Sequence, residues 1–269
     1  IKLGKVLDQK LGEEVTYLPS PVLQAMYSRC IQVMEERPHP DVAVTSEQLT
    51  ALKHVLDTGR APYADFSVFV WHAARMLKKA TLAGAIFDAK GVLHDVEMFG
   101  PGSVDEWLKS YNCLETAFIM LDTVSRPNLS AYKKHITNMA QQFGPSVWHL
   151  LYQTDVRCRQ ELMEHVKLEL FENHNQAVAT GAHSSFNVNR PWDAVWKHVI
   201  CDPTSIKWWT EQFERPAFLI LTRTAKMESM VEDYETPINA RGNNGASSSG
   251  ANSPPAPHPG KRPTKRLPK

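Results

Sequence analysis

One tripeptide in the sequence is typical of a catalytic site. Residues 57–59 spell Asp-Thr-Gly, as in aspartic proteases, where two such loops share one proton between their carboxylates. Here the tripeptide closes a helical pattern that Thr45 can cap, and no later glycine-centred apolar strand completes the protease signature. We therefore predict a helix end at Asp57 and keep an aspartic protease as the last of three alternatives.

The best grouping of metal ligands is Cys158 with His165, two helical turns apart, and Glu161 between them. Structural zinc requires four ligands, and only two soft ones are present. The sequence also lacks G-x-x-x-x-G-K-[ST], G-x-G-x-x-G, H-E-x-x-H and G-x-S-x-G. We expect no catalytic residue, metal or cofactor, no small-molecule substrate, and no enzyme activity.

Aromatic residues offer a different chemistry. Four of the seven tryptophans fall between 192 and 209. Exposed indole rings stack nucleic-acid bases, whereas buried ones form the core of a small helical unit. We favour the core and leave base stacking open.

The segment 236–269 holds six basic residues and no acidic one. Subtracting these six charges from the net charge of +1 leaves −5 for residues 1–235. Its Gly, Asn, Ser, Ala and Pro content predicts a disordered tail. Its cations could bind the phosphates of RNA or DNA or act as a nuclear address, and a solvated linker is the alternative. They are Arg241, Lys261, Arg262, Lys265, Arg266 and Lys269.

Elements that would position these groups are mostly helical. Apolar residues at helical spacing, bounded by caps, prolines and glycines, predict helices over 22–36, 45–58, 65–80, 103–121, 127–143 and 145–171. Alternation on either side of a glycine turn predicts a β-hairpin at about 82–99. The fold class is therefore mainly α: a multi-helix bundle with one small hairpin, a small C-terminal helical unit and a disordered tail.

Composition shifts divide the chain into five regions. We expect a lead-in (1–18), a main helical domain with the hairpin (19–172), a linker (173–189), a small Trp-rich helical unit (190–235) and the disordered basic tail (236–269).

Cysteine usage and hydropathy indicate the compartment. Four widely spaced cysteines form no C-x-x-C pair, and no apolar run approaches the roughly 20 residues that span a bilayer. No signal-peptide pattern opens the chain, which begins at Ile1 as a fragment of a longer polypeptide would. We expect an intracellular protein, cytoplasmic or nuclear, with no membrane partner.

Two blocks of packing residues occur together in a known family. They cover residues 62–159 and 190–219, and the chain resembles the Gag-like region of reverse-transcriptase-containing, retroelement-like polyproteins of unicellular algae. The motifs include Pro62-Tyr63-Ala64-Asp65-Phe66, Trp107-Leu108-x-Ser110-Tyr111, Gly144-Pro145-Ser146-x-Trp148, Arg190-Pro191-Trp192-Asp193-x-Val195-Trp196, Trp208-Trp209 and Pro216-Ala217-Phe218-Leu219.

This resemblance implies a non-catalytic structural segment that supports self-association or nucleic-acid packaging. In that family the segment precedes a Cys/His zinc module, and this chain stops at Lys269 before any such cysteines. The implied partners are further copies of the chain, and RNA or DNA through the tail or through the downstream zinc module absent here. A direct nucleic-acid-binding protein, using the tail and the 192–209 tryptophans, is the alternative.

Overall fold

The computed structural model describes residues 1–8, 11–72, 74, 81–87 and 92–235. Residues 1–226 form one compact unit. A second unit, 227–269, is described only for the end of its helix, up to residue 235.

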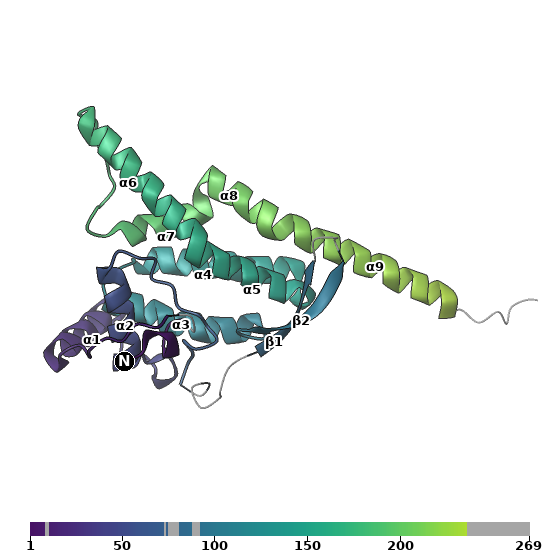
Figure 1. The fold of residues 1–269 in the computed structure, drawn as a ribbon, viewed down its shortest axis with the longest axis horizontal. Helices are drawn as coiled ribbons and strands as arrows, with labels where there is room; N and C mark the ends of the chain where they lie inside the picture. Colours follow the sequence, from purple (N-terminus) through teal and green to yellow (C-terminus); the bar gives the residue numbers. More distant parts are fainter. Residues whose placement is uncertain (9–10, 73, 75–80, 88–91, 236–269) are drawn as a thin grey trace, which may run out of the picture. The chain divides into compact units, whose positions relative to one another are not determined.

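The described part of the chain is mainly helical, as the sequence predicts. The helices are Ser20–Met34 (α1), Ser46–Asp57 (α2), Val104–Met120 (α3), Arg126–Phe143 (α4), Trp148–Arg157 (α5), Met163–Ala179 (α6), Pro191–Cys201 (α7), Pro203–Trp209 (α8) and Arg215–Glu235 (α9). Short 3-10 turns lie at Leu3–Lys5, Pro40–Val42 and Pro145–Val147, and π-helical turns at Cys158–Leu162 and Thr210–Glu214. Figure 1 shows α3 and α4 side by side, and α7 contacts both α4 and α6.

The hairpin is confirmed. Strands Thr81–Phe87 (β1) and Leu93–Phe99 (β2) pair antiparallel, with Thr81 opposite Phe99 and Phe87 opposite Leu93. Its turn, 88–91, lies outside the described residues. The pair packs on α5, which places it at one end of the helical core.

Helix starts follow the capping signals. The Thr45 side chain accepts from the Gln48 amide while the Gln48 side chain accepts from the Thr45 amide, so α2 begins with the predicted capping box. At α3 the Ser103 hydroxyl accepts from the Glu106 amide, but the Glu106 carboxylate accepts from Gly102 at 2.7 Å. The capping box at Ser103 is therefore only half formed, because the Glu106 carboxylate bonds to the amide of Gly102 instead of that of Ser103.

The predicted helix at 65–80 is wrong over the part that the structure describes. Residues 66–68 form a turn, in which Asp65 accepts hydrogen bonds from the amides of Ser67 and Phe69. Phe66 and Phe69 are fully buried. Two aromatic residues three positions apart can both be buried from a turn as well as from a helix. Their spacing alone therefore could not distinguish a turn from a helix. Residues 75–80 lie outside the described part.

Helix α6 continues into the predicted linker at 173–189. It ends at Ala179, just before Gly181, which has a φ of +74°. Residues 173–176 are polar, and 173–179 contain neither glycine nor proline, so the polarity marks a solvated helix surface rather than a loop. The left-handed glycine ends the helix.

Most of the predicted Trp-rich unit at 190–235 is not separate, because residues 190–226 belong to the same compact unit as the rest of the chain. Trp192, Trp196, Val199, Trp209 and Phe213 belong to the same buried cluster as the residues of α3 and α4. The lead-in joins this cluster too, because Leu3 and Leu7 are fully buried. One core therefore draws on residues from both ends of the compact unit.

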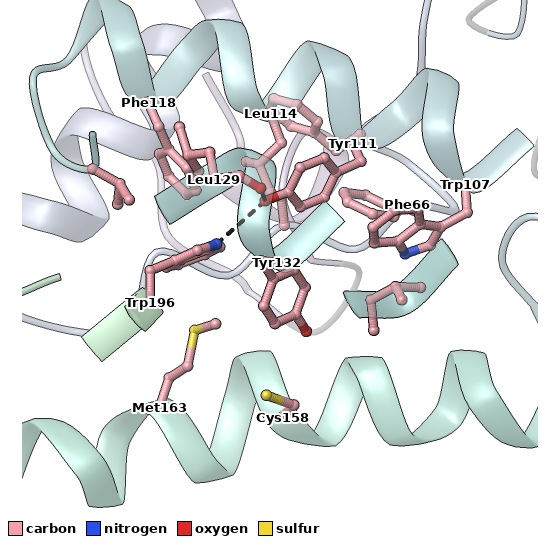
Figure 2. Packing of buried hydrophobic residues seen from close by; sticks show 14 of the residues in the cluster. Phe66, Trp107, Tyr111, Leu114, Phe118, Leu129, Tyr132, Cys158, Met163 and Trp196 are labelled. Carbon is pink, nitrogen blue, oxygen red and sulfur yellow. Dashed lines mark hydrogen bonds between the residues drawn. The ribbon is translucent and has the colours of Figure 1, made fainter. Parts of the chain in front are cut away.

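Aromatic rings form the centre of that core. Trp107 stacks on Tyr111 with ring centroids 4.7 Å apart, and Tyr111 stacks on Tyr132 at 5.9 Å. Trp196 meets Phe118 edge-on at 5.0 Å, and its Nε1 donates to the Tyr111 hydroxyl at 3.2 Å. Figure 2 shows these rings in one layer, with Cys158 and Met163 pointing toward them from a facing helix. Because α3, α4 and α7 each contribute a ring, the layer fixes their mutual packing.

Candidate functional site

The predicted nucleic-acid-binding residues of the tail lie outside the described residues. This holds for all six cations: Arg241, Lys261, Arg262, Lys265, Arg266 and Lys269. Their role stays a prediction from the sequence.

Asp57 is the last residue of α2, where the sequence predicts a helix end. Its carboxylate pairs with Lys53 at 2.5 Å, four residues earlier, and its side chain is 59% exposed. An exposed carboxylate held by a surface lysine lacks the shared proton that the protease mechanism needs. The geometry gives the aspartic protease alternative no support.

The ligands of the weighed metal site do not converge. Cys158 is fully buried and burial raises the pKa of its thiol, whereas His165 is exposed. The Glu161 carboxylate accepts from Arg157 at 3.2 Å. In the described ranges we find no group of three or more His, Cys, Asp or Glu side chains that could hold a metal ion.

The tryptophans at 192–209 do not form a base-stacking surface. Trp192, Trp196 and Trp209 are at most 4% exposed. Trp208 is partly buried, edge-on to Trp209 at 5.3 Å, and Arg157 covers its ring at 5.9 Å. Because stacking requires an open ring face, the burial of these three rings supports the core interpretation of the tryptophans.

The core of the described part contains a buried ion pair that the sequence analysis missed. Arg159 donates to Asp155 at 2.7 Å, and the two side chains are 1% and 0% exposed. The other donors to this carboxylate are Trp107 Nε1 at 3.0 Å and the Tyr132 hydroxyl at 2.7 Å. Although burial opposes the charge, Asp155 holds the pKa of Arg159 above its usual range.

The remaining donors and faces of Arg159 are also engaged. Its Nη1 donates to the carbonyl of Ala64 at 2.7 Å, and the guanidinium covers the ring of Phe66 at 4.2 Å. The π-helical turn Cys158–Leu162 carries Arg159. No open face is left for a substrate in this cluster, so we interpret it as structural.

We expect His135 on α4 to make the protein sensitive to acid. Its Nε2 is buried without a hydrogen-bond partner in the described part, and its ring meets Trp209 edge-on at 4.9 Å. Burial, opposed by Glu214, lowers its pKa from 6.5 to about 4.

Stability should therefore fall as the pH drops from 6.5 to 4, because the unfolded chain takes up the proton first. The expected loss from His135 is about 3 kcal/mol. Urea unfolding of wild type and His135→Phe at several pH values checks this, since phenylalanine keeps the ring contact without the proton. The two stability curves should diverge below pH 6.5, and parallel curves would contradict the assignment.

A polar cavity of about 710 Å³ is lined by α6, α7 and the connection between these two helices. The connection is visible in Figure 1. Its walls combine two permanent cations, three imidazoles, amides and hydroxyls with a single carboxylate. Its lining residues that carry polar or aromatic groups are Asn128, Asn173, His174, His183, Ser184, Ser185, Phe186, Asn187, Arg190, Asp193, Lys197 and His198.

Helix α9 carries the most exposed pair of adjacent apolar side chains in the described part. Phe218 is 63% and Leu219 is 56% exposed, while the neighbouring Ala217 is fully buried. The helix thus attaches to the core by one side and presents a phenylalanine and a leucine on another.

Comparisons with family models, curated proteins and solved structures found no match to this chain. Within the described residues, no helix is both long enough and apolar enough to cross a membrane.

Proposed function

We propose that the chain is a non-catalytic, Gag-like structural segment that self-associates through α9. The supporting observation is the exposed pair Phe218 and Leu219 on a helix whose other side is attached to the core. Contiguous exposed apolar side chains mark interaction surfaces more often than isolated ones do. The resemblance of residues 62–159 and 190–219 to Gag-like regions supports the same role.

The proposed occupant is a second copy of α9, paired antiparallel about a two-fold axis between Phe218 and Leu219. The apolar contact is small. We therefore expect weak association, with a dissociation constant of about 10–100 µM.

Sedimentation equilibrium between about 1 and 200 µM tests the proposal. The average mass of the wild-type chain should rise with concentration. Combined Phe218→Glu and Leu219→Glu substitutions should keep it monomeric, because they place repelling charges at the centre of the contact.

The matched control changes two equally exposed apolar residues of α6. Leu168 and Val178 are 62% and 61% exposed, so their replacement by glutamate adds the same charge elsewhere. The control should associate like wild type. A wild-type chain that stays monomeric, or a control as impaired as the α9 variant, would contradict the proposal.

Nucleic-acid binding through the basic tail is the second proposed function, supported by the charge division between residues 1–235 and 236–269. Binding of single-stranded RNA or DNA should weaken steeply with salt and disappear when 236–269 is deleted. An intracellular location, cytoplasmic or nuclear, is part of this proposal. None of the four cysteines, Cys30, Cys113, Cys158 and Cys201, forms a disulfide, as is usual in a reducing compartment.

A further inference from the structure

Helix α4 presents to solvent a side that carries cations and amides but no carboxylate. Its opposite side packs on the core through Leu129, Tyr132, Ile136 and Met139, which are all buried. Residues four positions apart on a helix share one side, so the solvent side forms a continuous row. We call this row the outer face of α4. It consists of Arg126, Ser130, Lys134, Asn138 and Gln142, and all five residues are exposed.

The charge of α4 differs in sign from that of the body around it. The helix contains three permanent cations and neither Asp nor Glu. Residues 1–235 as a whole carry a net charge of −5, which is the total of +1 less the six tail cations. A cationic surface on an acidic body attracts an anionic partner to one place.

The carboxylate beside this surface does not cancel its charge. Glu115 on α3 is buried, and it accepts hydrogen bonds from Lys133 at 2.5 Å and from Ser130 at 3.5 Å. The third cation of α4 is therefore used inside the protein. Arg126 and Lys134, in contrast, form no ion pair with any residue that the structure describes. Two exposed cations are thus left for an external anion.

Arg126 occupies a place that disfavours a cation. It is the first residue of α4, and the first turn contains no acidic residue. The helix dipole puts partial positive charge at this end, so it opposes a guanidinium there. Residues that break such a local rule are found mostly at functional or strained sites. An anion at this end of α4 would meet the guanidinium and the helix dipole together.

The spacing of the outer face suits a chain of anionic groups. At 1.5 Å per residue, Arg126 and Lys134 stand about 12 Å apart along the helix axis. One small anion cannot contact both cations over this distance, whereas successive phosphates of one strand can. Asn138 and Gln142 continue the row with amides, which are among the groups that contact phosphate and sugar oxygens in nucleic-acid complexes.

We propose that the outer face of α4 binds the backbone of a single-stranded nucleic acid, with Arg126 and Lys134 as its phosphate-binding residues. This inference rests on the second proposed function, because two cations bind weakly and the tail supplies the other phosphate contacts. A single strand is favoured over a duplex, since its lower charge density meets less repulsion from the acidic body.

Fluorescence anisotropy of a labelled oligouridylate, titrated with the full chain between about 50 and 200 mM salt, tests the proposal. Arg126→Gln combined with Lys134→Gln should weaken binding at least about fivefold at the lower salt. The slope of log K against log salt should fall in magnitude by about 1.4, because each phosphate contact of a single strand contributes about 0.7. Both positions are exposed, so the variant should keep the fold.

The matched control removes two exposed cations away from α4. Lys5 lies in the first 3-10 turn, and Lys207 on α8 is 76% exposed. Lys5→Gln combined with Lys207→Gln changes the net charge equally, and it should alter affinity by less than about twofold with the slope unchanged. Amine labelling adds a direct readout: the oligonucleotide should protect Lys134 of the wild-type chain several-fold and leave Lys207 accessible.

The outcomes separate this site from the tail. If the α4 variant binds and responds to salt like wild type, the proposal is overturned and binding belongs to the tail alone. If a chain without 236–269 keeps binding that the α4 variant removes, the tail function fails and the α4 site stands. No binding by the wild-type chain overturns both. Binding of polyglutamate instead of RNA through Arg126 and Lys134 would assign the face to an acidic protein and overturn the proposal.

Discussion

Replacement of Asp155 by alanine is expected to destabilise the protein by about 3–5 kcal/mol, because it leaves the Arg159 guanidinium buried without its counter-charge. The same change removes the acceptor of Trp107 Nε1 and of the Tyr132 hydroxyl. Neither group can reach water instead, since both residues are fully buried. The substitution therefore leaves three buried donor groups without their acceptor at once.

Urea unfolding followed by tryptophan fluorescence measures this loss, and Asp57→Ala is the control. Asp57 and Lys53 also form an ion pair four residues apart, but their side chains are 59% and 36% exposed. We expect this control to cost less than about 1 kcal/mol. Equal losses of unfolding free energy in the two variants would show that burial does not strengthen the contribution of the ion pair.

Removal of both charges is a further test of the cause. Asp155→Leu combined with Arg159→Met should recover part of the stability lost in Asp155→Ala, because no uncompensated charge remains. If the double variant is instead clearly less stable than Asp155→Ala, the loss in the single variant comes from packing and not from an uncompensated charge.

Gly100→Ala is expected to destabilise the protein by about 3 kcal/mol or more, from steric overlap and backbone strain together. Gly100 follows β2 with a φ of +146°. A Cβ atom there would lie 2.6 Å from Cζ of Tyr152 and closer still to Cε1. Tyr152 is only 2% exposed and stacks on Trp148, so its ring has little room to move.

Gly144→Ala separates the two contributions. Gly144 also has a positive φ, +79°, but no atom lies within 4 Å of a Cβ placed there. Its substitution should cost about 1–3 kcal/mol, from backbone strain alone. Thermal unfolding of both variants provides the comparison, and equal shifts in Tm would mean that the approach of Tyr152 to the backbone is unimportant.

Sequence reasoning succeeded where the signal is local. The cap at Thr45 and the helical spacing over 127–143 depend only on neighbours along one helix, and both elements formed as predicted. The hairpin was predictable for the same reason, because alternation on either side of a glycine turn is a local pattern.

Sequence reasoning failed where distant residues decide. Arg159 bonds the carbonyl of Ala64, 95 residues away, and no spacing rule links the two. Trp196 was assigned to a separate unit because residues 173–189 are polar, yet its indole bonds to Tyr111. The cavity between α6 and α7 was missed as well, since its groups come from three segments that only the fold brings together.

The bond from Trp196 to Tyr111 spans 85 residues and that from Arg159 to Ala64 spans 95. During synthesis, α3 and α4 emerge long before α7 exists to cover them. Until then the rings of Tyr111, Phe118 and Tyr132 lack one wall of their pocket. A nascent chain in this state exposes an aromatic surface that attracts chaperones or other nascent chains, so the order of translation leaves this fold most vulnerable just before its last tryptophans are made.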